Sequence, residues 1–358
     1  MLIGAIVVAL YGWLVIVAAG NALLMRRVRP GGTGPGLRPA VLIPARNEAP
    51  HIGSLVGSLV AQGARVYVFD DESDDGTGLL AAEAGATVIR ASEPLPEGWT
   101  GKNRACHELA KVTAEDFAGD WLLFLDADVQ VKAGFVDGVA GLIAARGSRV
   151  PVFSGFLRML PGAGFEPVYL SWVPWVLLAS NPFGLVARTG RGHNGFTNGQ
   201  FVLWRAATYW EVRPHESLRS RVLEDVATGR LLAKHGIRID VVDLAAVGSV
   251  RMYRTLREAI DGMSKNSVEI AGPGVGSWLL AFGFLVAGWA WTAAGPLWPW
   301  ALGLLLASKF VTDRLVGQPI WTWPLMPITC TLAAFTVVRS WMLRRAGAAT
   351  WKGRIVGR

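Results

Sequence analysis

The sequence has only two cysteines, Cys106 and Cys330, in 358 residues. They lie far apart and show no metal-ligand spacing, so we expect a reducing compartment and no disulfide framework. Charged residues are also scarce, at 17%, whereas hydrophobic residues make up 52% of the chain. This composition is too apolar for an ordinary soluble enzyme. Because the middle of the chain is nevertheless charged, we expect separate membrane and soluble parts.

The first segment has no charged residue from Leu2 to Met25. It is long enough to cross a bilayer at roughly 1.5 Å per residue. A cleaved signal peptide would carry basic residues before its apolar run, and none are present. Instead, Arg26, Arg27 and Arg29 follow the run, which the positive-inside rule assigns to the cytoplasm. We therefore predict a transmembrane helix over residues 1–26.

A second apolar block over residues 275–342 predicts transmembrane or interfacial helices. Hydropathy suggests three segments, about 276–294, 297–312 and 321–341. Three full spans would place the basic tail, residues 343–358, outside, but its charge favours the cytoplasm. Either one segment is re-entrant or interfacial, or the tail is an exception to the charge rule, and we expect the tail to lie inside. The net charge of +8 is explained by anionic lipid headgroups, at about 1 kcal/mol per basic residue, rather than by nucleic acid.

The middle of the chain, residues 38–270, alternates short apolar runs with helical patterns. Runs at 40–43, 66–69, 86–89 and 121–125 predict strands of a parallel, doubly wound α/β sheet. Such sheets bind ligands beyond the carboxyl ends of their strands. Arg46-Asn47-Glu48, Asp70-Asp71 and Asp126-Ala127-Asp128 each follow a predicted strand, so we expect these groups to converge on one crevice.

Two of these groups suggest specific chemistry. Asp126 and Asp128, at alternate positions of an extended chain, project the same way and could share a divalent cation with a diphosphate. A single acidic pair of this kind could also be a simple turn. Asp71 is suited to accept a hydrogen bond from a nucleobase, whereas Asp74 and Asp75 could cap a helix that starts near Thr77.

Three motifs resemble a known family by their order and spacing. IPARNEA at 43–49, FDDESDDGT at 69–77 and LDADV at 125–129 are similar to the glycosyltransferase family 2 catalytic domain, which has the Rossmann-like, mostly parallel GT-A fold. The resemblance covers about residues 38–260. Glu72 departs from the usual glycine of DDGS, so we expect the turn after Asp71 to differ slightly. The resemblance implies that Pro44, Arg46 and Glu48 line the nucleotide pocket, Asp71 contacts the base, and Asp126 and Asp128 hold the diphosphate through Mg²⁺ or Mn²⁺.

The segment GWTGKNRAC at 98–106 opens a predicted helix. The helix N-terminus and Lys102 could offer positive charge to the donor, although the pattern alone also fits a solvated first turn. The segment resembles the membrane-bound subgroup that glucosylates carotenoids, hopanoids and ceramides, and so does WKGR at 351–354. UDP-glucose is the donor implied by this subgroup, and GDP-mannose remains an alternative. The tail would then lie near a cytosolic active site.

An inverting transfer to a hydroxyl group needs a base opposite the leaving diphosphate. Adjacent carboxylates at Glu224 and Asp225 occupy the place of the family's ED pair, which implies that Asp225 is the base and Glu224 supports it. A capping or surface pair is the alternative. The NGQF segment at 198–201 resembles the acceptor-side element of the family, which implies that Asn198 and Gln200 orient the acceptor.

Arg251 and Arg254 resemble part of the Q/R-x-x-R-W motif of related membrane synthases. Two arginines three residues apart could share a helical face and neutralise the departing diphosphate. Thr255 replaces the usual tryptophan, which favours transfer of a single sugar over synthesis of a polysaccharide.

The acceptor is expected to be hydrophobic, because Glu166 is the only charged residue between Arg158 and Arg188. Pro167, Pro174 and Pro182 argue against a straight span, so we predict an interfacial segment that presents a lipid, with Trp172 and Trp175 on the acceptor side. Ordinary buried core is the alternative.

The sequence thus predicts an inverting, metal-dependent glycosyltransferase at the cytoplasmic face of the cell membrane. Its partners would be a nucleotide-sugar donor and a membrane lipid such as a carotenoid, hopanoid or sphingolipid-like alcohol or acid. A polyprenyl-phosphate glycosyltransferase would need no base, because its acceptor is already ionised. A membrane-tethered nucleotidyltransferase would release pyrophosphate, and a transporter would carry its functional ionisable groups within the spans.

Overall fold

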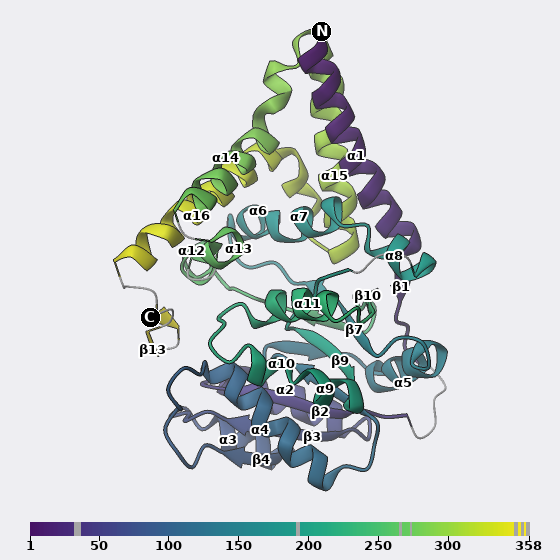
Figure 1. Cartoon of the computed structure of the whole chain (residues 1–358), viewed down its shortest axis with the longest axis vertical. Coiled ribbons are helices and arrows are strands. Elements are labelled where there is room, and N and C mark those ends of the chain that lie inside the picture. Colours follow the sequence, from purple (N-terminus) through teal and green to yellow (C-terminus); the bar gives the residue numbers. More distant parts are fainter. Residues whose placement is uncertain are drawn as a thin grey trace. The chain divides into compact units, whose positions relative to one another are not determined.

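The computed structural model describes residues 1–31, 37–190, 194–264, 267–272, 274–346, 350–351 and 354–355. The chain forms two compact units (Figure 1). An α/β unit contains Arg26–Arg158 and Thr189–Val250, and a helical unit contains Met1–Met25, Met159–Arg188 and Arg251–Arg358. The segment 38–270, predicted as one catalytic domain, is thus interrupted by residues that pack in the helical unit, and the α/β unit ends at Val250.

An eight-stranded sheet in the order β1-β10-β7-β9-β5-β2-β3-β4 forms the centre of the α/β unit. All neighbouring strands are parallel except β9, which is antiparallel to both β5 and β7. The predicted α/β class with a mostly parallel sheet is confirmed. The strands are β1 (Arg26–Arg27), β2 (Ala40–Ala45), β3 (Arg65–Asp70), β4 (Thr87–Arg90), β5 (Trp121–Leu125), β7 (Val152–Phe156), β9 (Phe201–Arg205) and β10 (Ile239–Asp243).

The four predicted strands are β2, β3, β4 and β5. The strand β5 and most of β2 and β3 are buried, and they carry apolar side chains on both faces, as expected for central strands between helical layers. Because β3, β2 and β5 are direct neighbours and parallel, their carboxyl ends lie at one edge of the sheet. The three polar groups therefore lie at one edge of the sheet, and their convergence on one crevice stays a prediction.

Helices flank the sheet, and two of them begin where the sequence predicts. The helix α3 starts at Thr77, and Asp75 accepts a hydrogen bond from the Thr77 amide at 3.0 Å. The helix α4 starts at Gly101, and the Thr100 hydroxyl accepts from the Asn103 amide at 3.3 Å. The helices of this unit are α2 (Ala49–Val60), α3 (Thr77–Glu83), α4 (Gly101–Asp116), α5 (Phe135–Arg146), α9 (Ala206–Val212), α10 (Pro214–Ser217) and α11 (Glu224–Lys234).

The chain also forms short strands outside the eight-stranded sheet. The strand β6 (Val129–Val131) pairs antiparallel with β11 (Gly248–Val250). The strand β8 (Arg158–Met159) lies where the chain leaves the α/β unit. A hairpin of β12 (Thr350–Trp351) and β13 (Arg354–Ile355) forms in the tail. Of the basic tail positions, Lys352 and Arg358 lie outside the described residues, so the location of the tail stays a prediction.

The helical unit contains long apolar helices in two packed pairs: α1 runs along α15, and α14 runs along α16 (Figure 1). By length and composition, Leu2–Leu24, Val275–Ala293 and Ile320–Arg345 are candidate membrane spans, as predicted. The helix α15 contains Lys309, Asp313 and Arg314 and is not among the candidates found in the described residues. The long elements are α1 (Leu2–Leu24), α14 (Val275–Trp289), η1 (Ala290–Ala293), η2 (Gly295–Leu297), α15 (Trp298–Val316), η3 (Ile320–Leu325) and α16 (Met326–Arg345), and the short helices α12 (Leu256–Ser264) and α13 (Ser267–Ala271) precede them.

The proline-containing segment is also apolar enough to be a candidate span, but it is not straight. It forms α6 (Glu166–Leu170), α7 (Trp172–Ser180) and α8 (Phe183–Thr189). These helices cross three of the long ones: Tyr169 bonds to Thr336 of α16 at 2.7 Å, Trp175 donates to Ser308 of α15 at 3.0 Å, and Asn21 of α1 donates to the Leu178 carbonyl at 2.8 Å. Asn21 lies in the last turn of α1. The segment therefore crosses the bundle at one end of α1, and its interfacial position stays a prediction.

Candidate active site

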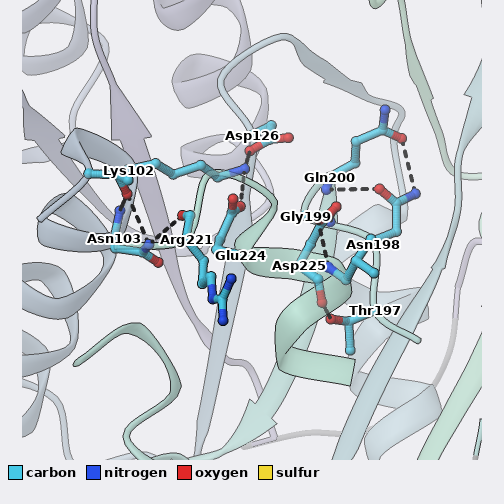
Figure 2. A network of polar contacts seen from close by, with 12 residues as sticks. Lys102, Asn103, Asp126, Thr197, Asn198, Gly199, Gln200, Arg221, Glu224 and Asp225 are labelled. Atoms are coloured by element: carbon cyan, nitrogen blue, oxygen red, sulfur yellow. Dashed lines mark hydrogen bonds and ion pairs between the residues drawn. The ribbon is translucent and has the colours of Figure 1, made fainter. Parts of the chain in front are cut away.

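A pocket in the α/β unit brings together predicted site residues from four separate stretches of the chain. We call it the carboxylate pocket. Three carboxylates and one lysine surround its polar part, which Figure 2 shows. Its lining consists of Pro44, Lys102, Cys106, Phe124, Leu125, Asp126, Thr197, Gly199, Val202, Trp204, His215, Glu224, Asp225 and Thr228.

Lys102 lies at the centre of this group, between two acidic side chains (Figure 2). Its Nζ is 2.7 Å from Oδ1 of Asp126 and 2.9 Å from Oε1 of Glu224. Burial alone would lower the pKa of Lys102, but Asp126, Glu224 and Asp225 raise it well above its usual value, so the lysine is charged. The first turn of α4 is thus part of the site rather than a solvated surface.

Asp225 and Glu224 begin α11, and their carboxylates have different partners. Asp225 accepts the backbone amide of Gly199 at 3.2 Å and that of Val226 at 2.7 Å. Glu224 pairs with Lys102 and is buried. Burial raises the pKa of Asp225, although Lys102 and the two amides act in the opposite direction, and burial raises the pKa of Glu224 to about 7. The two amides fix the orientation of the half-buried Asp225 carboxylate, and its role as the base stays a prediction.

The antiparallel strand β9 brings the NGQF segment to this place. Because β9 runs opposite to β5, with Phe201 paired to Leu125, the turn before β9 lies beside the carboxyl end of β5. Asn198 shapes that turn by donating to the Gly155 carbonyl at 3.0 Å and to Oε1 of Gln200 at 3.3 Å (Figure 2). A Cβ at Gly199 would lie 2.9 Å from Nζ of Lys102, so the turn passes close to the lysine. The acceptor roles of Asn198 and Gln200 stay predictions.

Asp126 and Asp128 follow β5 and are the candidate metal ligands. No group of three or more His, Cys, Asp or Glu side chains in the described part of the chain could hold a metal ion alone. The buried Oδ1 of Asp128 has no hydrogen-bond partner there. Burial raises the pKa of Asp128 to about 7, and the charges of Asp126 and Glu48 add to the shift. Two oxygen ligands with excess negative charge fit a hard divalent cation whose remaining ligands come from a diphosphate and water.

Arg46 is the centre of the contacts in the predicted nucleotide pocket. Its Nη1 donates to the backbone carbonyl of Asp71 at 2.6 Å and lies 3.5 Å from Oε2 of Glu72. The Asp71 side chain is buried. Glu72 has φ +59°, so it adopts the left-handed conformation that the family's glycine would favour. The expected difference in this turn is therefore in the side chain and not in the backbone region. Base recognition by Asp71 stays a prediction.

Two residues of the site were missed by sequence reasoning. Asn103 is buried, and its Nδ2 donates to the carbonyls of Leu218 and Arg221 at 3.0 Å each, which fixes the loop before α11 to α4 (Figure 2). His215 lines the pocket, and its Nδ1 is 2.9 Å from the Tyr209 hydroxyl. Asn103 lies within the motif GWTGKNRAC, which could have suggested it, whereas nothing in the local sequence marks His215.

Four predicted site residues lie in the helical unit. Trp172 and Trp175 are each 3% exposed: Trp172 packs against Phe284, and Trp175 bonds to Ser308. This burial matches the alternative of an ordinary core, and an acceptor role for the two indoles stays a prediction.

Arg251 and Arg254 are exposed and precede α12. The expectation that they share a helical face is wrong, because Arg251 directly follows β11 and the chain becomes helical only at Leu256. Their role toward the diphosphate stays a prediction.

Comparison with known proteins agrees with the motifs. Residues 40–197 match the model of the family named Glycosyl transferase family 2. This segment belongs to glycosyl transferase family 2. The match begins at β2 and ends at Thr197, so it contains Lys102, Asp126 and Asp128 but not Glu224 and Asp225.

Curated relatives share about a quarter of the aligned residues with this chain. The chain is 25% identical over 235 residues to the 4,4'-diaponeurosporenoate glycosyltransferase of Staphylococcus haemolyticus (strain JCSC1435), covering 63% of this chain and 60% of that protein. It is 24% identical over 224 residues to the enzyme of the same name from Staphylococcus aureus (strain MRSA252), covering 60% and 56%. The chain thus spans less than two thirds of the length of these relatives.

Solved structures give weaker likenesses. A crystal structure of S. aureus TarS 1-349 aligns with TM-score 0.42 and 17% identity, covering 87% of this chain and 92% of that one. Glucosyl-3-phosphoglycerate synthase from Mycobacterium tuberculosis, in complex with Mn²⁺, UDP and phosphoglyceric acid, aligns with TM-score 0.45 and 22% identity, covering 71% and 89%.

Proposed function

We propose that this protein transfers a single sugar from a nucleotide diphosphate sugar to a membrane lipid, with inversion at the anomeric carbon. The observation that carries the proposal is the carboxylate pocket of a family 2 domain, where the candidate base Asp225 lies close to the candidate diphosphate site at Asp126. The curated relatives, named for 4,4'-diaponeurosporenoate, support a carotenoid-type acceptor. The resemblance of GWTGKNRAC to lipid glucosyltransferases supports UDP-glucose as the donor.

The donor would bind along the sheet edge. Asp71, buried beside Arg46, would accept a hydrogen bond from the base, and the carboxylates of Asp126 and Asp128 would hold Mg²⁺ or Mn²⁺. The cation, when bound, supplies positive charge to the diphosphate as the bond to the sugar breaks. The ammonium group of Lys102 lies beside the Asp126 carboxylate and would add a second positive charge near the diphosphate.

The proton would go to Asp225. The acceptor oxygen forms a bond to the anomeric carbon, the bond from that carbon to the diphosphate oxygen breaks, and the hydroxyl proton moves to the Asp225 carboxylate. The amides of Gly199 and Val226 orient this carboxylate, and Glu224 holds Lys102. Because burial raises the pKa of Asp225, it is a stronger base than a solvated aspartate. The diphosphate leaves with the nucleotide, so the reaction needs no other reactant.

The helical unit would keep the protein at the bilayer, where the acceptor dissolves. Its candidate spans expose large apolar side chains such as Leu10, Phe282 and Phe335. The segment of α6, α7 and α8 crosses the bundle at one end of α1, as an interfacial element would.

The proposal is tested with membranes that contain the full chain, incubated with radiolabelled UDP-glucose and extracted lipids. We expect label in the lipid fraction with the native protein and none with Asp128→Ala. Asp120→Asn is the matched control, because Asp120 is exposed and lies just before the amino end of β5, away from the site. Label in the lipid fraction from Asp128→Ala as strong as from native protein, or release of pyrophosphate without labelled lipid, would reject the proposal.

The acceptor is identified by comparing the lipids of cells with and without the gene by mass spectrometry. We expect a glycosylated carotenoid, hopanoid or sphingolipid-like species that is present only with the gene. A phosphate-linked polyprenyl sugar in its place would favour the alternative acceptor class, for which Asp225 is not needed as a base.

A further inference from the structure

The position of Lys102 has a consequence for how a divalent cation enters the site. Its ammonium group is 2.7 Å from Oδ1 of Asp126, one of the two candidate metal ligands. It is also held by Oε1 of Glu224 at 2.9 Å. A positive charge therefore already occupies the ligand side of Asp126 before any donor has bound.

The site is also short of ligands for a free metal ion. In the described residues, no group of three acidic, histidine or cysteine side chains could hold a cation. Of the two candidate metal ligands, Asp128 has a buried oxygen, Oδ1, that accepts no hydrogen bond from the described residues. An incoming dication would have to displace Lys102 from Asp126 or remain beside it, and like charges a few ångströms apart in a partly buried site repel strongly.

A nucleoside diphosphate removes both obstacles. Its oxygens supply the missing metal ligands, and its negative charge offsets the repulsion between the metal and the ammonium group. The lysine could then pair with the diphosphate while Glu224 keeps it in the site.

We propose that Lys102 gates the metal site: it substitutes for the cation at Asp126 in the donor-free protein, so that the metal binds tightly only together with a nucleoside diphosphate. This rests on the proposed function for the identity of the donor. Lys102 acts here as a positioning residue through Asp126. Because coupling between two ligands is reciprocal, the metal tightens nucleotide binding by the same factor.

The test measures Mn²⁺ binding to the full chain in detergent by electron paramagnetic resonance, with and without UDP. For native protein, we expect UDP to tighten Mn²⁺ binding by at least about 10-fold, within the usual range of coupling between sites. For Lys102→Met, we expect Mn²⁺ alone to bind at least about 10-fold more tightly than it binds native protein, and UDP to add less than about 3-fold. Lys111→Met is the matched control, because Lys111 lies on the same helix and pairs with Glu108 at the surface.

Two further variants separate the charge of the lysine from its shape. Lys102→Gln removes the charge and keeps a polar chain, so it should behave as Lys102→Met does and replaces it if that variant fails to fold. Lys102→Arg keeps the charge and should leave Mn²⁺ binding weak without UDP. Unchanged Mn²⁺ affinity in folded Lys102→Gln, or tight Mn²⁺ binding in Lys102→Arg, would overturn the gate.

The outcome is independent of the transfer reaction. If native protein labels no lipid but Mn²⁺ binding shows the expected pattern, the proposed function fails and the gate stands. If lipid is labelled but Lys102→Gln binds Mn²⁺ as native protein does, the gate fails and the function stands.

Discussion

Two ion-paired lysines, one in each unit, show how a functional charge cluster differs from a structural one. Lys102 in the α/β unit has a side chain that is 26% exposed, and Asp126, Glu224 and Asp225 surround it. Lys309 in the helical unit is 0% exposed and forms an ion pair with Asp313, one turn along α15. Thr322 donates a further hydrogen bond to Asp313 at 2.9 Å.

The difference lies in the balance of charge. The pair in α15 is neutral as a unit, so it needs nothing from outside the protein. The carboxylate pocket keeps an excess of negative charge that a ligand must offset, and sites of this kind are typically functional. Changes in the pocket should therefore reduce activity more than stability, and changes in the α15 pair should do the reverse.

The sharpest test of the pocket is Asp225→Asn. We expect turnover to fall by about 10³-fold, because a positioned base contributes 10²–10⁴-fold. The affinity for UDP should not fall, because Asp225 is not one of the candidate donor ligands. The melting temperature should fall only slightly, because asparagine keeps one of the two acceptors of the Gly199 and Val226 amides and removes a charge beside Glu224. Transfer of labelled sugar measures the first quantity, and calorimetric titration with UDP measures the second. Retained turnover would show that the acceptor is already ionised.

The corresponding change in the helical unit is Lys309→Met. It leaves Asp313 buried without its partner, so we expect a loss of about 3 kcal/mol in unfolding free energy. Lys309→Met combined with Asp313→Leu should restore most of it, because a buried ion pair can be replaced by apolar groups at little cost. Thermal unfolding in detergent measures both. A double variant that is as unstable as the single one would show that the pair has a role beyond charge balance.

The buried histidine that lines the pocket, His215, allows a test by the pH dependence of stability. Burial lowers the pKa of His215 to about 3, whereas an unfolded histidine titrates near 6.5. Between these values the unfolded state binds more protons, so stability falls as pH falls below 6.5. We expect this to cost about 2 kcal/mol at pH 5 relative to pH 7.5.

The comparison variant is His215→Asn, whose side chain can still bond to the Tyr209 hydroxyl. Its stability relative to native protein should improve by about 2 kcal/mol between pH 7.5 and pH 5, because it has no proton to gain. Denaturant unfolding at these two pH values is the measurement. A constant difference would mean that His215 is not kept neutral by the fold.

The part of this site that follows strand ends could be predicted from sequence. Buried apolar runs mark β2, β3 and β5, and in a parallel sheet polar residues after neighbouring strands must meet at one edge. That argument places Arg46, Asp71 and Asp126 correctly. The carboxylates Glu224 and Asp225 and the NGQF turn are predicted only by family resemblance, because nothing in the local sequence predicts that β9 enters the sheet antiparallel between β5 and β7.

Long-range packing explains why some features of the site and of the helical unit could not be predicted from sequence. His215 reaches the pocket from a four-residue helix, and its partner Tyr209 lies on another helix, so no periodic pattern marks either. Trp172 and Trp175 are buried because α7 packs against α15 and α14, which come more than a hundred residues later. An apolar segment without charges fits both an interface and a core, and only the contacts distinguish the two.

The smallest expected effect concerns backbone strain at the edge of the nucleotide crevice. The non-glycine residues with positive φ in the described part of the chain are Asn47, Glu72 and Arg213, and all three lie in the α/β unit. Glu72, at φ +59°, has no special tolerance for this conformation.

Replacing Glu72 changes both the strain and its 3.5 Å contact with Arg46, so a single variant is ambiguous. Glu72→Gly and Glu72→Ala both lose the contact, but only glycine relieves the strain. The glycine variant should be about 1 kcal/mol more stable than the alanine variant in thermal unfolding. Equal stability of the two variants would mean that the positive φ at position 72 causes no strain. The α/β unit would then be no more strained at this turn than the helical unit is.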